Sequence, residues 1–166
     1  FNSLHESFSL QRGIQADGLS GLTKKHGYVV SAADCALVAV KNGNLVIAAH
    51  AGRNSVIDMN YMKGGEKREN ESVVHAILKR IVGANLDIQR THGWIGFSIS
   101  PGPQFAHASN DHENPHNRKM VEYVARHYGP SCFKQDGQGG TLGWLDVKEL
   151  IRRQFLSLGV PEGNIE

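Results

Sequence analysis

The 166-residue sequence predicts an α/β fold in a single domain, with a central, mostly buried mixed sheet flanked by about three helices. Two apolar runs rich in β-branched residues, 35–40 and 45–50, enclose an Asn-Gly pair, the strongest short-range signal of a β-hairpin. Later stretches repeat apolar residues at the 3.6-residue period of a helix and carry capping residues at their ends. A chain of this length can bury a substantial core.

The hairpin sets the predicted position of two reactive side chains. If Asn42-Gly43 is a two-residue type I′ loop, Lys41 pairs with Asn44, and Cys35 lies directly opposite His50. The Cβ atoms of such a pair are about 4.5–5.5 Å apart, so a thiol and an imidazole can meet. Both faces of the hairpin are apolar, so we expect its strands to be covered on both sides, with the two reactive residues at one open end.

Further strands are expected before and after the hairpin. Residues 1–27 have mixed polarity and several glycines, and we expect loops around one short strand. Residues 28–33 (YVVSAA) predict a strand that runs into the hairpin. Residues 93–99 (GWIGFSI) predict another strand, which a Pro-Gly-Pro turn ends.

Helices are expected at three places in the second half of the chain. The first keeps the helical period over 73–81, with Asn70 as its cap. The second covers 117–128 and ends at a Gly-Pro pair. The third starts at Asp146, in a D-x-x-E pattern close to a capping box, and ends at Gly159.

Composition excludes several classes of protein. The formal net charge of +2 with mixed signs gives no basic patch, so there is no case for nucleic-acid binding. No apolar run reaches membrane-spanning length, and no signal-peptide pattern opens the chain. Two cysteines do not make a disulfide framework and fit a reducing compartment. We therefore expect a cytoplasmic protein without membrane or nucleic-acid partners, of an oligomeric state that the sequence leaves open.

A thiol beside an imidazole supports two chemistries. His50 can take the proton of Cys35, whose thiolate then attacks a carbonyl or amide carbon. Asp34 is the nearby group that could orient the histidine, although we favour a role for it as the cap of a backbone turn. Alternatively, Cys35 and His50 bind zinc, together with a third protein ligand and an open position for water or substrate. A third interpretation is structural, because cysteine is often buried and can face a histidine without any function.

The other histidines carry weaker signals. His107, His112 and His116 share a polar stretch with acidic residues, and we expect a solvated loop in which they do not share a metal. His75 lies off the apolar stripe of the first predicted helix, and we expect it to be solvated.

The sequence around the Cys–His pair resembles the laccase-domain family, first called multicopper polyphenol oxidases and now described as purine nucleoside phosphorylases. The family signature is an ADC strand followed by a strand ending in HAGWRG, with an ADALV segment before them and a GPxIGPxxF segment after them. The matching stretches in this chain keep the same order: ADGL at 16–19, ADC at 33–35, AAHAG at 48–52, GFSISPGPQF at 96–105 and LDVKELIRRQFLSLGVPEGNI at 145–165.

This resemblance implies a fold akin to the catalytic domains of cytotoxic necrotising factors. It also implies a site of one cysteine and two histidines that holds zinc, with copper as an alternative. Cys35 and His50 match two of these residues, and His5 occupies the place of the second family histidine. The implied activity is phosphorolysis of adenosine- or inosine-type nucleosides, deamination of adenosine, or both, with a purine nucleoside and phosphate as the small-molecule partners.

The chain also departs from the family pattern. HAGWRG is replaced by HAGRNS, so the tryptophan is missing and Arg53, the expected phosphate-binding residue, is displaced by one position. A polar insert delays the following helix. The chain opens with Phe1 and stops where the family continues, so the expected single domain over 1–166 is compatible with truncation at both ends. The altered motif leaves open a catalytically inactive binding or structural module.

Overall fold

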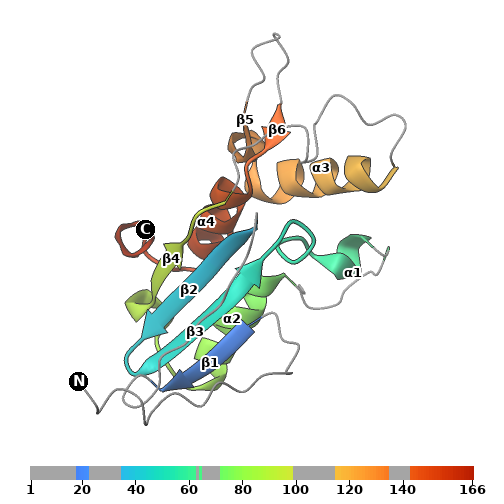
Figure 1. The fold of residues 1–166 in the computed structure, drawn as a ribbon. Helices are drawn as coiled ribbons and strands as arrows, with labels where there is room; N and C mark the ends of the chain where they lie inside the picture. The colour runs from blue at the N-terminus through green and yellow to red at the C-terminus, as the bar shows by residue number, and fades with distance from the viewer. Residues whose placement is uncertain (1–17, 23–34, 63, 65–71, 99–114, 135–142) are drawn as a thin grey trace, which may run out of the picture.

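The computed structural model describes residues 18–22, 35–62, 64, 72–98, 115–134 and 143–166 (Figure 1). Its strands form two sheets, one with the order β1-β3-β2-β4 and one with the order β5-β6. The elements are β1 (Gly18–Leu22), β2 (Ala36–Asn42), β3 (Leu45–Ala51), α1 (Met59–Met62), α2 (Val73–Gly83), β4 (His92–Ile95), α3 (Pro115–Tyr128), β5 (Phe133–Lys134), β6 (Trp144–Leu145) and α4 (Val147–Ser157).

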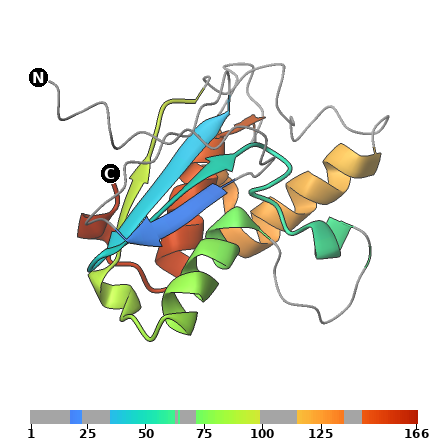
Figure 2. The ribbon, with the colours of Figure 1, turned by 60° about the horizontal axis from the view of Figure 1, so that its bottom comes forward.

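The predicted α/β fold class is confirmed. Helices α2 and α4 lie on one side of the four-stranded sheet (Figure 2), and α3 packs against α4. All the strand pairs described are antiparallel, rather than mixed, and the parallel contact between Gly93 and Ile165 is an isolated bridge. The strand expected over 93–99 is shorter in the structure, where β4 ends at Ile95, and the strand expected over 28–33 lies outside the described residues.

The two faces of the β2–β3 hairpin are not equivalent. The face toward the helices is fully buried and includes Ala36, Val38 and Val40, none more than 1% exposed. On the opposite face, Leu37 and Ala48 are only half-buried. The expected cover is confirmed on the side where the described helices pack, and for the other side it stays a prediction. The half-buried face is the one that carries His50.

The hairpin register differs from the prediction by two residues. The loop is Gly43-Asn44, not Asn42-Gly43, so Asn42 pairs with Leu45 and Leu37 lies opposite His50. Gly43 has a positive φ of 58°, whereas Asn44 does not, as in a type II′ turn rather than a type I′ turn.

The physical reason for the shift is the Asn42 side chain. Asn42 is 3% exposed, and its Nδ2 donates to Asp87 O at 2.7 Å and to Thr91 Oγ1 at 3.0 Å. Buried polar groups need such partners, so these bonds hold Asn42 in the strand and the turn begins one residue later. Because side chains alternate with a period of two, a two-residue shift leaves every side chain on its predicted face.

Two helix starts are corrected and one is confirmed. Helix α2 is capped by Ser72, whose Oγ accepts the backbone N–H of His75, whereas Asn70 lies outside the described residues. Helix α3 begins at Pro115, so His116 belongs to its first turn and not to a loop. Asp146 caps α4 as predicted, because its Oδ1 accepts the backbone N–H groups of Lys148 and Glu149, each at 3.1 Å.

His75 is half-buried, not solvated as expected. Ser72 Oγ lies 2.8 Å from His75 Nδ1 and can donate its proton to a neutral ring. Burial lowers the pKa of His75 from its ordinary value of 6.5, and the nearby carboxylate of Asp58 opposes this shift. Native His75 is therefore harder to protonate than His75 in the unfolded chain.

We expect this shift to appear in the pH dependence of stability. Below about pH 6.5 the unfolded chain binds a proton at His75 before the native chain does, so the free energy of unfolding falls as the pH falls toward the native pKa. His75→Gln should lose less stability than the wild type between pH 7.5 and 5.5, as measured by urea unfolding. Equal losses of unfolding free energy in the wild type and in His75→Gln would contradict a lowered pKa of His75 in the native protein.

Candidate functional site

Cys35 and His50 converge beside Gly52. Cys35 directly precedes β2, and His50 is the penultimate residue of β3. A Cβ atom built on Gly52 would lie 3.3 Å from Cys35 Sγ, 3.1 Å from His50 Cε1 and 3.4 Å from His50 Nε2. The thiol and the imidazole therefore border the same small space, which stays open because residue 52 has no side chain.

The route to this geometry differs from the predicted one. Because Leu37 lies opposite His50, Cys35 is displaced by two residues along β2 and is not the direct cross-strand partner. The two residues still share a face, since the register shift is an even number. Cys35 and His50 are both half-buried, and Cys35 is a free cysteine. Both side chains are thus in reach of a small ligand.

The second cysteine does not compete for this role. Cys132 is fully buried in the short 3₁₀ helix (Pro130–Cys132) that follows α3, and burial raises the pKa of its thiol to about 12. It therefore stays protonated at neutral pH, and the thiolate is the form that binds metals and reacts as a nucleophile. Of the two cysteines, Cys35 is the one available for chemistry.

A tight turn follows β3 and holds Gly52 in place. The backbone N–H groups of Ser55 and Val56 donate to Gly52 O at 2.9 and 3.1 Å, and Ser55 Oγ donates to the same oxygen at 2.8 Å. The N–H of Val73, at the start of α2, donates to Ser55 O at 2.7 Å. Arg53, expected to bind phosphate, is half-buried in this turn.

The remaining predicted site residues are not placed beside the pair. His5, Asp34, His107 and His112 lie outside the described residues, and His116 belongs to α3. Across the described ranges, no group of three or more His, Cys, Asp or Glu side chains could hold a metal. The prediction that the histidines at 107–116 do not share a metal therefore stays a prediction.

Cys35 and His50 can supply two of the ligands that a soft metal needs. A thiolate sulfur and an imidazole nitrogen are ligands of zinc, and the same donors bind copper. Cys35 and His50 supply one of each, both bordering the space beside Gly52. A zinc site needs further ligands, and His5 is the residue expected to supply a third.

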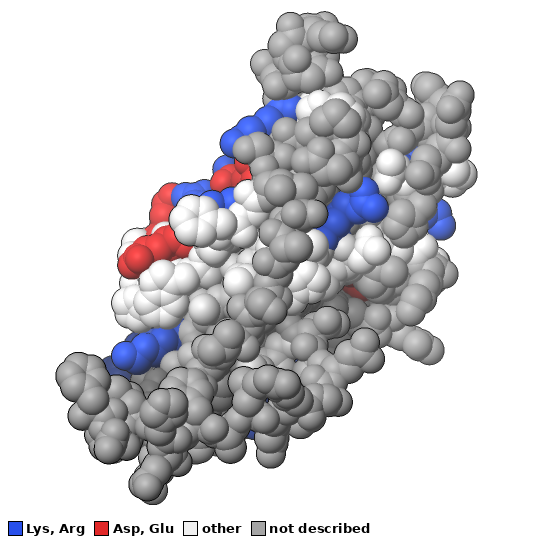
Figure 3. Space-filling view, viewed as in Figure 1, with Lys and Arg blue, Asp and Glu red and all other residues white. Residues whose placement is uncertain are grey.

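Several uncharged side chains lie on the same face of the sheet as the pair. Trp94 of β4 pairs with Ala39 of β2 and is 37% exposed, and Gly96 N–H donates to Leu37 O at 2.7 Å. Figure 3 shows uncharged side chains over much of the described surface at β2 and β4, with acidic and basic side chains around them.

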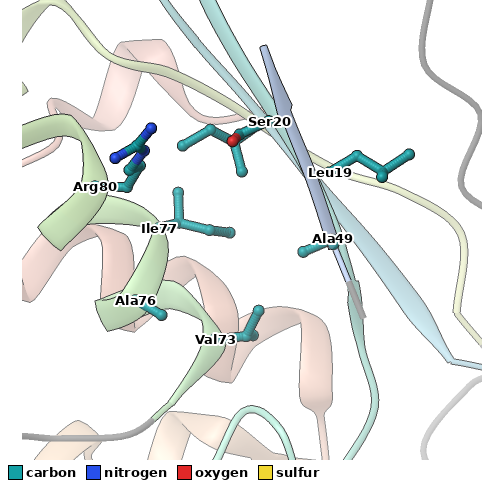
Figure 4. Close-up of a pocket in the computed structure, with 9 residues that line it drawn as sticks. Leu19, Ser20, Ala49, Val73, Ala76, Ile77 and Arg80 are labelled. Atoms are coloured by element: carbon teal, nitrogen blue, oxygen red, sulfur yellow. The ribbon is translucent and has the colours of Figure 1, made fainter. Parts of the chain in front are cut away.

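A separate pocket lies on the other face of the sheet, between β1 and α2 (Figure 4). It has a volume of about 280 Å³ and is mostly apolar, with Ile47 and Ala49 on one wall and Ile77 on the other. Arg80 and Ser20 lie at one end, and Leu19 points away. Cys35 and His50 do not line this pocket, so it is not part of the thiol–imidazole site.

Two residues of the site region were missed by the sequence analysis. In the sequence, Gly52 stands out only as part of the HAG motif, although its lack of a side chain leaves the space that the Cys35 thiol and the His50 imidazole border. Gln154 is fully buried and binds the turn after β3, through a bond from its Nε2 to Val56 O of 2.6 Å. The available signal was its position, since it is a polar residue within the apolar stripe formed by Leu150, Ile151 and Phe155.

A cysteine and a histidine converging on one face of an antiparallel sheet, with helices on the other face, define an α/β protein with a thiol–imidazole site. The chain belongs to the family described as multi-copper polyphenol oxidoreductase laccase, which it matches over residues 3–166. This confirms the resemblance seen in the sequence and identifies an enzyme-like family. No curated protein matches the chain.

Solved structures of similar fold agree with this assignment. Protein NMB0706 of Neisseria meningitidis is 20% identical, with a TM-score of 0.56, and the match covers 90% of this chain and 51% of that one. The hypothetical protein YfiH of Bacillus licheniformis is 19% identical, with a TM-score of 0.53, over 81% of this chain and 43% of that one. YlmD of Geobacillus stearothermophilus is 22% identical, with a TM-score of 0.51, over 80% and 42%.

The chain spans about half the length of these solved structures or less, and at such identities the likeness concerns the fold alone. The likeness to cytotoxic necrotising factor domains stays a prediction. Within the described residues, no helix is both long and apolar enough to cross a membrane.

Proposed function

We propose that this chain is a zinc-dependent enzyme that processes purine nucleosides, by phosphorolysis of the N-glycosidic bond or by deamination of adenosine. The observation that carries the proposal is the convergence of the Cys35 thiol and the His50 imidazole beside Gly52, in a chain of the laccase-like family. The same face of the sheet carries the partly exposed ring of Trp94, opposite Ala39, which supports a planar aromatic ligand such as a purine.

Each expected residue has a role in this proposal. Cys35, His50 and His5 would hold the metal, and zinc would supply an activated water for deamination. Arg53, which directly follows Gly52, would bind phosphate through its guanidinium group. In phosphorolysis a phosphate oxygen bonds to C1′ of the sugar as the bond to the base breaks, and the departing base takes up a proton. Copper is the alternative metal that the family description names.

A metal-free thiol deamidase or hydrolase is the second candidate. It is supported by the same geometry, because a thiol and an imidazole side by side suffice for a nucleophile and its base. In that case the described pair is complete without His5. A binding or structural module without catalysis is the third candidate, in view of the altered motif after His50.

The test is elemental analysis of freshly purified protein, run beside a nucleoside panel. We expect about one zinc per chain, as a single three-ligand site binds one ion. Adenosine and inosine should release free base only when phosphate is present, or adenosine should release ammonia without it. A chelator should stop the reaction, and added zinc should restore it. Zinc-free protein that hydrolyses amides and ignores chelators would instead establish the thiol enzyme.

A further inference from the structure

Gln154 is a buried polar residue in an otherwise apolar helix face. Its side chain is fully buried within α4, between the core residues Ile151 and Phe155. Its Nε2 donates to Val56 O at 2.6 Å, across 98 residues of sequence. Within the described part of the chain, its Oε1 has no hydrogen-bond partner. A buried amide whose oxygen has no partner among the described residues is costly compared with an apolar side chain of the same shape, so its presence at this position calls for an explanation.

The bond from Gln154 ends on the turn that shapes the thiol–imidazole site. Val56 O accepts from Gln154, while the N–H of Val56 donates to Gly52 O at 3.1 Å. Gly52 in turn borders Cys35 Sγ and His50 Nε2, at 3.3 and 3.4 Å from its ideal Cβ position. Two hydrogen bonds therefore connect the interior of α4 to Gly52, beside which the two reactive side chains meet.

We infer that Gln154 is a positioning residue. Its hydrogen bond from α4 fixes the turn 52–56 and so holds the Cys35 thiol and the His50 imidazole together. The inference rests on the Cys35–His50 site of the proposed function, but not on its substrate or its metal. Gln154 touches neither reactive side chain in the described contacts, so its effect passes through Val56 and Gly52.

The test uses the coupling between the two reactive residues, which is the effect of His50→Gln on the rate of Cys35 alkylation. It is measured in the full chain after a chelator has removed any metal that would shield the thiolate. Iodoacetamide reacts with thiolate, and Cys132 is fully buried, so intact-mass spectrometry follows Cys35. We expect His50→Gln to slow alkylation of the wild type at pH 7 by about threefold or more, as for residues in contact. In the Gln154→Met background, alkylation should already be slow, and His50→Gln should change it by less than about twofold.

A merely structural role would give a different pattern. Phe155→Leu is the matched control, because Phe155 is fully buried in the same helix and its ring lies 3.4 Å from the ideal Cβ position of Gly93 in β4. It should lower the melting temperature and keep the full effect of His50→Gln. If Gln154→Met also keeps the full effect of His50→Gln, Gln154 is only a core residue and the inference is wrong.

Two further arms keep the test decisive. If Gln154→Met does not fold, Ser55→Ala loosens the same turn by removing the bonds of Ser55 Oγ to Gly52 O at 2.8 Å and to His50 O at 3.5 Å. It should weaken the coupling in the same direction. Ser55→Ala with intact coupling would then contradict the inference. Absence of zinc and of nucleoside turnover in the wild type would refute the proposed function while leaving this coupling intact. If His50→Gln, as a single substitution, leaves the rate of Cys35 alkylation unchanged, then Cys35 and His50 do not act as a pair and the inference is wrong.

Discussion

In the proposed zinc enzyme, Cys35→Ser should remove most of the metal and lower nucleoside turnover by more than about a hundredfold, since even outer-shell partners of a metal are worth 10- to 100-fold. A hydroxyl is a far poorer ligand for a soft metal than a thiolate, although it is similar in size. The fold should be unaffected, because Cys35 is half-buried and lies before the first residue of β2. Cys132 cannot replace it, because that thiol is fully buried.

The measurement combines metal content, activity and melting temperature of the same preparation. Cys132→Ser is the matched control, and it should change stability but not metal content. If Cys35 is instead a nucleophile, iodoacetamide should inactivate the metal-free protein and a chelator should have no effect. His5→Ala separates these cases further, because a third ligand matters for metal affinity and is irrelevant to a two-residue thiol mechanism. Full activity in Cys35→Ala would contradict both the zinc-enzyme and the thiol-enzyme hypotheses. The hypothesis of a binding module without catalysis at this site would then remain.

The elements that the sequence predicts correctly are those with local causes. Helix α4 follows from Asp146, whose side chain accepts two backbone N–H groups within the first turn, and from apolar residues spaced along one face. The two strands of the hairpin follow from their apolar runs, and the side-chain alternation assigns each residue to its face. Cys35 and His50 could therefore be placed on one face of the sheet from the sequence alone.

The features that were missed depend on contacts between distant parts of the chain. The position of the turn is decided by Asn42, which binds Asp87 and Thr91, 45 and 49 residues away. No local signal tells whether an Asn before Gly opens the loop or ends the strand. Likewise, Gln154 reaches the turn after β3 across 98 residues. A polar residue in an apolar stripe indicates that such a partner exists, but not where it lies in the chain.

Gly52→Val should have the second large effect, because it fills the space where the thiol and the imidazole meet. The first atom of the new side chain would lie 3.1 Å from His50 Cε1 and 3.3 Å from Cys35 Sγ, closer than the ordinary van der Waals range of 3.4–4 Å. Gly52 has no positive φ, so its backbone accepts a side chain and the conflict is one of space alone. The two methyl groups of valine must displace the ring or the sulfur.

We expect Gly52→Val to lose about a hundredfold in activity, the scale of a 1 Å misplacement of a reacting group. Overpacking should also cost about 1–3 kcal/mol of stability, so the comparison is made well below the melting temperature. Gly52→Ala should have a smaller effect in the same direction, because a single methyl asks its neighbours to move by only a few tenths of an ångström.

Gly83→Val is the control for glycine replacement as such, because nothing lies within 4 Å of its ideal Cβ position and its φ is not positive. It should keep full activity and metal content. The decisive readout is the coupling of Cys35 alkylation to His50, which Gly52→Val should abolish and Gly83→Val should preserve. If Gly52→Val retains metal, activity and coupling, the two side chains do not work together in the space beside residue 52, and the site must be sought elsewhere on the molecule.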